Sequence, residues 1–180
     1  IQSIIFLAVF YFSGQLKNTP EAQFLVDKTV KQSITKIILE GSGDTMVTLK
    51  KNKSSWSLPN LNNFPANDQA VNQLLTRLVE VKKGVQVSKQ ETSFERLKVS
   101  DNSFERKVSL YSNNSLIDEI YFGSAPSLRQ AHARKSSEKS VFAVKFAAND
   151  IDLQPSDWIK KDILVISKKE IKTIVTPDIF

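Results

Sequence analysis

The sequence contains no cysteine and a single histidine, His132, among its 180 residues. Without cysteine there is no disulfide framework, no thiolate zinc site, no iron–sulfur cluster and no cysteine nucleophile. A metal site built from several histidines is excluded as well, and a Ser–His–acid triad would have to use His132. We therefore expect a protein that is not an enzyme, with no catalytic residues, no metal and no cofactor.

Glycine and proline are also scarce, with 5 and 6 residues respectively, which excludes a collagen-like or proline-rich linker protein. Hydrophobic residues make up 41% of the chain and charged residues 24%, a balance unlike that of a disordered acidic tail. A chain of this length fits one domain, and such a domain buries enough apolar surface to fold without disulfides or metals.

The net charge is +6, and many of the lysines occur as separate pairs rather than in one run. These pairs are Lys50–Lys51, Lys82–Lys83, Lys160–Lys161 and Lys168–Lys169. They lack the interleaved aromatic residues of a groove for single-stranded nucleic acid, so we expect no nucleic-acid partner. Two interpretations stay open: a solvated basic surface, or attraction to an anionic membrane face or anionic glycan.

The N-terminal stretch over residues 1–12 carries no charge and ends in the aromatic residues Phe10, Tyr11 and Phe12. It is compatible with a truncated transmembrane helix, with the apolar core of a signal peptide, or with a buried helix. No small-residue cleavage site follows it, and aromatic residues favour the membrane–water boundary. We expect a truncated transmembrane anchor over 1–14 and a juxtamembrane linker over 15–32.

The rest of the chain predicts an α+β fold in which antiparallel β-hairpins pack on one main amphipathic helix. The helix is expected from about Asn67 to Val81, because Val71, Leu74, Leu75 and Leu78 form one apolar stripe. Segments rich in β-branched residues, separated by turn residues, predict the strands. Their ranges are 33–40, 45–50, 56–58, 85–88, 106–111, 116–122, 130–135, 141–146, 163–166 and 171–176.

The two ends of the soluble part share a sequence pattern. Residues 34–38 (ITKII) resemble residues 171–175 (IKTIV). We therefore expect an extracytoplasmic domain over 33–166 and a last strand within 167–180 that starts a second repeat unit. The alternative is that two amphipathic strands share β-branched residues by chance.

Four residues are candidates for an interaction surface: Trp56, His132, Arg134 and Trp158. The two tryptophans suit either a platform that stacks on carbohydrate or a pin that holds a loop on the core. His132 and Arg134 suit a polar pair on a strand, and His132 lacks a second histidine, a cysteine or a G-x-S-x-G motif as a catalytic partner.

Two acidic pairs are also candidates for catalytic groups. Asp118 and Glu119 are expected on opposite faces of a strand, which separates their carboxylates. Asp150 and Asp152 are expected beside a short helical turn as capping or surface groups. Neither pair predicts a shared acid–base site.

Several short motifs follow one another in a recognisable order. They are Trp56-Ser57-Leu58, Ala66-Asn67-Asp68, Phe94-Glu95-Arg96-Leu97-Lys98-Val99, Phe122-Gly123, His132-Ala133-Arg134 and Val141-Phe142-Ala143-Val144. In this order and spacing the chain resembles the bacterial DUF4340 family, a domain of unknown function, from about Val30 to Val175.

The resemblance implies a membrane-anchored, extracytoplasmic domain, because members of this family are often linked with ABC-type transporter components, including gliding-motility auxiliary proteins. It brings no catalytic residues to this chain. We expect a single-pass protein of the bacterial inner (cytoplasmic) membrane whose soluble domain faces the periplasm or the exterior. Its expected role is an accessory or scaffold domain whose partner is an ABC-type permease or related membrane protein. The rival hypotheses are an envelope glycan- or ligand-binding module and a hydrolase that uses His132 as its base.

Overall fold

The structure is a computed structural model that describes residues 23–164. The expected anchor over 1–14, the last strand over 171–176 and the start of a second repeat unit lie outside the described residues. Within residues 23–164, no helix is long and apolar enough to cross a membrane.

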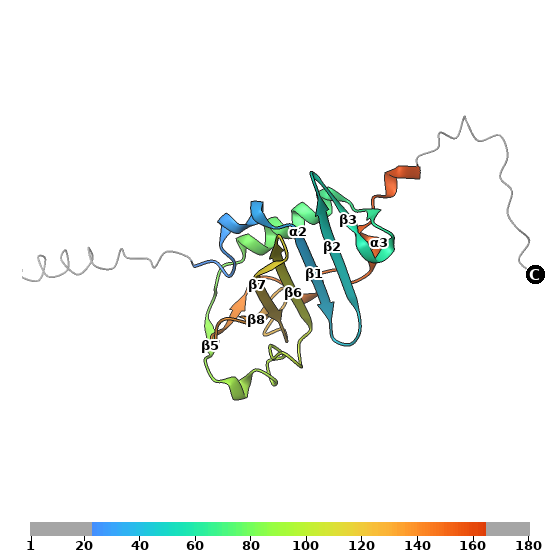
Figure 1. Ribbon diagram of the computed structural model, residues 1–180. Helices are drawn as coiled ribbons and strands as arrows, with labels where there is room; N and C mark the ends of the chain where they lie inside the picture. The colour runs from blue at the N-terminus through green and yellow to red at the C-terminus, as the bar shows by residue number, and fades with distance from the viewer. Residues whose placement is uncertain (1–22, 165–180) are drawn as a thin grey trace, which may run out of the picture.

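A single sheet of nine antiparallel strands forms the frame of the domain (Figure 1). Its strand order is β4-β3-β2-β1-β6-β7-β8-β9-β5. The strands are β1 (Lys36–Gly41), β2 (Met46–Asn52), β3 (Ser55–Leu58), β4 (Phe64–Pro65), β5 (Gln86–Ser88), β6 (Arg106–Ser112), β7 (Ser115–Phe122), β8 (Ala131–Lys135) and β9 (Val141–Val144). The hairpins β1–β2, β6–β7 and β8–β9 confirm the pairing that the sequence predicted.

The main helix, α2 (Asp68–Glu80), packs across one face of the sheet. It begins at Asn67, whose side-chain oxygen accepts hydrogen bonds from the backbone N–H groups of Gln69 and Ala70. Its apolar stripe is buried and includes Leu75, which is 2% exposed. The expected helix is therefore confirmed in position and in the face it buries.

The remaining helical elements are short. They are the 3-10 helices η1 (Lys28–Ser33), η2 (Pro59–Leu61), η3 (Glu91–Ser93), η4 (Ala148–Asp150) and η5 (Lys161–Leu164), and the helix α3 (Pro155–Trp158). Together with the antiparallel sheet and α2, these elements make an α+β fold, as predicted.

The two faces of the sheet are covered differently. The larger core lies between α2 and the face that carries Ile37, Leu39 and Leu110. A smaller apolar cluster lies on the opposite face, where residues 91–105, here named the covering segment, lie over β7, β8 and β9. The outer surfaces of β2, β1 and β6, here named the open half, carry polar and half-buried side chains.

Three local features differ from the sequence-based expectation. Leu25 and Val26, which were expected in a linker, are buried in the main core. The Leu25 N–H donates to the Val81 carbonyl, and this hydrogen bond attaches the segment to the end of α2. β4 lies outside the strand ranges expected from the sequence, and its Pro65 lies in the edge strand, where a missing N–H is tolerated. Lys161–Leu164 forms a 3-10 turn rather than an extended segment that begins at Ile163.

Candidate functional site

Arg134 is the best-connected polar side chain on the outer face of the sheet. It lies in β8, where Ala131 and Ala133 point into the main core. The alternation of a strand therefore turns Arg134 to the other face, beneath the covering segment. Its side chain is only 6% exposed.

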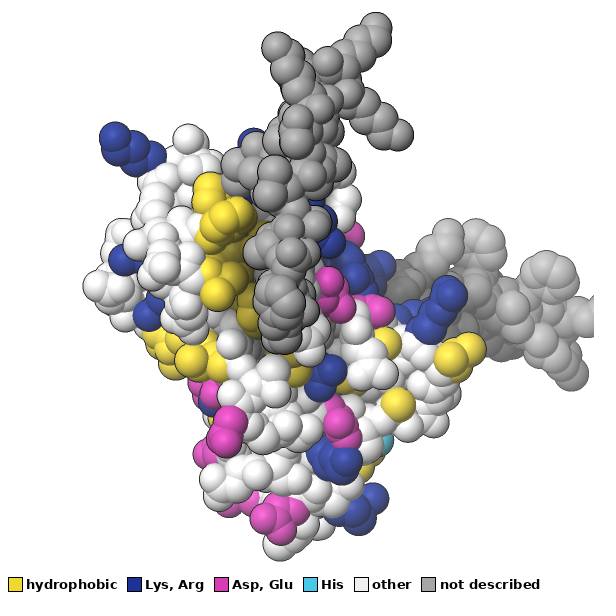
Figure 2. Space-filling model, turned by 90° about the vertical axis from the view of Figure 1, so that its right-hand side faces the viewer, with side chains coloured by type: hydrophobic (Ala, Val, Ile, Leu, Met, Phe, Trp, Pro, Cys, Tyr) yellow, Lys and Arg dark blue, Asp and Glu magenta, His cyan; other side chains and the backbone are white. Residues whose placement is uncertain are grey.

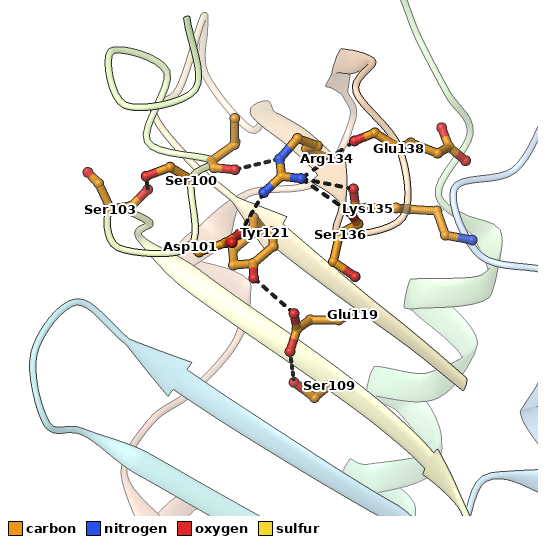
Figure 3. A network of polar contacts seen from close by, with 11 residues as sticks. Ser100, Asp101, Ser103, Ser109, Glu119, Tyr121, Arg134, Lys135, Ser136 and Glu138 are labelled. Carbon is orange, nitrogen blue, oxygen red and sulfur yellow. Dashed lines mark hydrogen bonds and ion pairs between the residues drawn. The ribbon is translucent and has the colours of Figure 1, made fainter. Parts of the chain in front are cut away.

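The guanidinium group of Arg134 is surrounded by hydrogen-bond acceptors (Figure 3). Its Nε donates to the Val99 carbonyl at 2.7 Å, and its Nη2 donates to Asp101 Oδ1 at 3.0 Å. Its Nη1 lies 3.3–3.5 Å from the carbonyl oxygens of Lys135, Ser136 and Glu138. These bonds tie the covering segment to β8 and to the turn that follows it.

Two aromatic rings sandwich the same guanidinium group. Its carbon lies 4.4 Å from the ring centroid of Phe94 and 4.7 Å from that of Tyr121. The Tyr121 hydroxyl donates to Glu119 Oε1 at 2.9 Å, and Ser109 donates to the other Glu119 oxygen at 3.0 Å. Burial and the hydrogen bond to Glu119 raise the pKa of the Tyr121 phenol well above its ordinary value, so the phenol stays protonated and donates.

A shallow pocket of about 400 Å³ opens beside Arg134. It is lined in part by the carboxylates of Glu91, Glu95, Asp101 and Glu119. Asp101 pairs with Arg134 and Glu91 pairs with Lys139, which leaves Glu95 and Glu119 as the carboxylates of the pocket without an ion pair among residues 23–164. The pocket is therefore suited to a cationic group rather than an anion.

His132 shares the outer face of β8 with Arg134 and lies against the β7–β8 connection. Its Nδ1 is 3.0 Å from Ser124 Oγ, which also lies 3.2 Å from the Leu97 carbonyl oxygen. Burial lowers the pKa of His132 below its ordinary value, with a smaller contribution from the charge of Arg96. Among residues 23–164, neither a hydrogen bond nor an ion pair joins the His132 ring to a carboxylate, so this is a Ser–His contact without an acid.

Gly123, the residue before Ser124, also lies against the Leu97 carbonyl. A Cβ at position 123 would lie 2.1 Å from the Leu97 carbonyl oxygen, so only glycine allows the two backbones to approach this closely. The Ser124 N–H donates to that same oxygen at 3.0 Å. Gly123, Ser124 and His132 together fasten the covering segment where it crosses the end of β7.

Trp56 and Trp158 lie in the other layer, near the start of α2. They are 3% and 4% exposed, and the Trp158 indole N–H donates to the Asp152 carbonyl at 3.1 Å. The backbone N–H of Trp56 donates to the Asp68 carboxylate, while the Asn67 N–H donates to the Trp158 carbonyl. The fold thus brings the two tryptophans together and brings His132 to Arg134, but it separates these pairs and buries all four side chains.

The two carboxylates of Asp118 and Glu119 lie on opposite faces of β7, as predicted. Glu119 joins Tyr121 on the outer face, whereas Asp118 forms an ion pair with Lys135 at 2.8 Å on the other. Burial raises the pKa of Asp118, and the Lys135 pair opposes that effect. Period-two alternation along β7 would have placed Glu119 and Tyr121 on the same face, whereas their position beside Arg134 depends on the β7–β8 register. The contribution of Phe94 and Asp101 depends on the path of the covering segment.

Nothing in the described part of the chain resembles a metal centre: no three His, Asp or Glu side chains within residues 23–164 are placed to hold an ion together. The polar groups on the outer face serve mainly to hold backbone segments in place. On this outer face, the carboxylate-lined pocket and the open half stay accessible within residues 23–164.

Comparison with known proteins gives one family. No curated protein and no solved structure matches the chain. The model of the family described as "Domain of unknown function (DUF4340)" matches residues 56–178. The matched region begins at the second residue of β3 and includes β4 to β9 and α2, whereas β1 and β2 precede it. Because this match covers more than half of the sequence, the chain belongs to the DUF4340 family.

Proposed function

We propose that this chain is a non-catalytic, membrane-anchored accessory or scaffold domain of a bacterial envelope system, and that its partner belongs to an ABC-type transporter. The observation that carries the proposal is the open half. Within residues 23–164, α2 covers one face of the sheet and the covering segment lies over only part of the other, so β2, β1 and β6 are left with a surface that could receive a protein partner.

The composition of the open half supports protein binding. Ile38 and Thr48 are half-buried and lie side by side on β1 and β2, next to the buried Ser109 of β6. Exposed apolar side chains flank these residues, since Met46 is 48% and Leu116 is 50% exposed. A mixed surface with apolar side chains among polar ones is typical of a reversible protein interface.

The position of the first described residues is also compatible with an N-terminal anchor. Residues 23–25 lie at the end of α2, where the Lys83 N–H donates to the Gln23 carbonyl and the Leu25 N–H donates to the Val81 carbonyl. The apolar stretch over 1–12 precedes this point in the sequence. We propose that this stretch holds the protein in the inner membrane, with the domain on the periplasmic or exterior side.

The alternative is an envelope ligand-binding module. Trp56 and Trp158 are buried and offer little ring surface to a sugar. The candidate binding site for this alternative is therefore the pocket beside Arg134. Its carboxylates favour a cationic ligand, such as an amino sugar or a basic peptide. Glu95→Gln would weaken such binding, because Glu95 is an exposed residue that lines the pocket.

The test is co-purification of the full-length protein from its native membranes in mild detergent, followed by mass spectrometry. We expect an ABC-type permease or ATPase in near-equal amounts, and we expect Thr48→Arg to release it by placing a long charged side chain on the open half. Gln73→Arg, on the exposed side of α2, is the matched control that should retain the partner. Recovery of the protein alone, or equal recovery of the partner with both variants, would contradict the proposal.

A further inference from the structure

One end of the sheet collects lysine side chains. At this end lie the start of β1, the turn between β2 and β3, the turn between β6 and β7, the helix η1 and the C-terminal end of α2. We name it the lysine end, and its lysines are Lys28, Lys31, Lys36, Lys50, Lys51, Lys53 and Lys82. Figure 2 shows Lys and Arg predominating toward the upper end, which carries the β2–β3 turn, and acidic side chains gathering lower.

The lysines of this end differ from the other cations in how they are paired. Toward the opposite end, Glu40 pairs with Lys107 and Glu105 with Lys98. In contrast, no lysine of the lysine end forms an ion pair with a carboxylate inside the range 23–164.

Instead, several of these lysines rest on neutral groups. The ammonium of Lys28 lies 3.9 Å from the ring centroid of Phe24, and that of Lys36 lies 3.9 Å from the ring centroid of Tyr111. Lys31 donates to the Thr76 hydroxyl at 2.7 Å. These contacts position the cations without neutralising them. Asp27, at the start of η1, and Glu80, at the end of α2, lie at the same end, so the seven lysines outnumber these two carboxylates and leave a net positive charge.

The lysine end also lies where the anchor would hold the domain to a membrane. Residues 23–25 pair with the strand-like segment that follows α2, beside Lys82. The residues between the apolar stretch over 1–12 and Gln23 can span at most about 35 Å. An anchor over 1–12 would therefore keep this end of the domain close to the lipid surface.

An exposed apolar side chain borders the same end: Leu116, beside the β6–β7 turn, is 50% exposed. Cationic side chains mixed with exposed apolar ones form the kind of surface that lies in a lipid headgroup layer. A purely solvated basic surface has no need of such an apolar group.

We propose that the lysine end binds the anionic headgroups of the membrane that holds the N-terminal segment. This orients the domain, with the β1–β2 turn pointing away from the lipid. The inference rests on the anchor of the proposed function, but the clustered lysines would attract an anionic surface even without that anchor. Each lysine in contact with anionic lipid contributes about fivefold to binding.

The absence of native cysteine makes a clean test possible with single-cysteine labels. Ser54→Cys places a fluorophore at the lysine end, and Ser42→Cys places the same fluorophore at the opposite end, in the β1–β2 turn. The full chain is reconstituted into vesicles of phosphatidylcholine alone or mixed with phosphatidylglycerol. Each vesicle contains a lipid-borne quencher, and quenching is compared at low and high salt.

We expect stronger quenching at position 54 than at position 42, an increase with phosphatidylglycerol, and its loss at high salt. Lys82→Glu is expected to reduce the phosphatidylglycerol-dependent quenching by about tenfold or more, since it removes one cation and adds an anion. Lys145→Glu, an exposed lysine just beyond β9, is the charge-matched control and should leave it unchanged.

The outcomes separate the anchor from the lipid contact. Flotation with pure phosphatidylcholine vesicles reports the anchor, whereas phosphatidylglycerol-dependent quenching at position 54 reports the lysine end. Flotation with equal quenching at both positions would overturn the inference and leave the anchor standing. Binding that needs phosphatidylglycerol would support the lysine end without the anchor. Retention of a soluble polyanion, with no response to phosphatidylglycerol, would overturn the lipid assignment.

Discussion

Arg134 and Tyr121 face each other across the β7–β8 pair, with the guanidinium carbon 4.7 Å from the centroid of the phenol ring. The same guanidinium donates to the Val99 carbonyl of the covering segment. One side chain of the sheet thus joins a strand pair to the segment that lies over it. This relationship explains why a buried arginine is tolerated here, since its charge is both stacked and hydrogen-bonded.

Arg134→Ala is expected to destabilise the domain by about 2–4 kcal/mol, because it leaves buried carbonyl groups without donors and opens space between two aromatic rings. Urea unfolding followed by tryptophan fluorescence measures the loss. Arg96→Ala is the control: this arginine belongs to the same covering segment but is exposed, and its loss should cost less than about 0.5 kcal/mol. Equal effects of the two substitutions would refute the role given to Arg134.

Gly123→Ala is expected to detach the covering segment at its crossing of β7. The added Cβ would meet the backbone oxygen atoms of Leu97 and Lys98, which cannot rotate away as a side chain does. We expect the free energy of unfolding to fall by about 1–3 kcal/mol or more, and the Ser124 N–H to exchange its hydrogen faster. Unchanged exchange at Ser124 would mean that this crossing is not held by the close approach.

The pH dependence of stability is expected to contain a contribution from His132. Because burial lowers its pKa in the folded state, the unfolded chain binds more protons at pH values below the ordinary value of 6.5. The contribution of His132 is therefore fully present above pH 6.5 and is lost as the pH falls toward its folded-state pKa. With only one histidine in the sequence, His132→Gln should flatten this slope in unfolding curves measured from pH 5 to 7.5, in the window where the histidine titrates. An unchanged slope in that variant would show that His132 titrates normally in the folded protein.

Leu75→Ala tests the packing of α2 on the sheet. Leu75 is 2% exposed in the main core, and its truncation is expected to cost about 2–5 kcal/mol in the free energy of unfolding. Gln73→Ala, on the exposed side of the same helix, should change stability by less than about 0.5 kcal/mol. A loss for Leu75→Ala below that value would place the apolar stripe of α2 on the wrong face.

Local patterns in the sequence were sufficient for most of the fold. The apolar spacing of Val71, Leu74 and Leu78 predicted α2, and Asn67 predicted its start. The alternation along β7 placed Asp118 and Glu119 on opposite faces, as the structure confirms. Each of these predictions depends on residues that are close in the chain, where geometry follows directly from the helical or strand period.

The candidate site was harder to predict because it joins residues that are far apart in the chain. The sequence indicates Arg134 as a candidate, but its contacts with Val99 and Asp101 depend on how the covering segment crosses the sheet. Similarly, Leu25 and Val26 were assigned to a linker, since nothing local shows that their backbone pairs with the end of α2. Contacts between residues that are far apart in the chain are set by the tertiary packing, and they leave no periodic pattern in the sequence.

The central claim is that the open half of the sheet receives a membrane-protein partner. A photo-crosslinking amino acid at position 48 of the full-length protein, activated in native membranes, tests it most directly, with position 73 on the far side of α2 as the comparison. The account predicts a crosslink to an ABC-type permease or ATPase from position 48 and none from position 73. No crosslinked partner from position 48, or the same products from both positions, would contradict it.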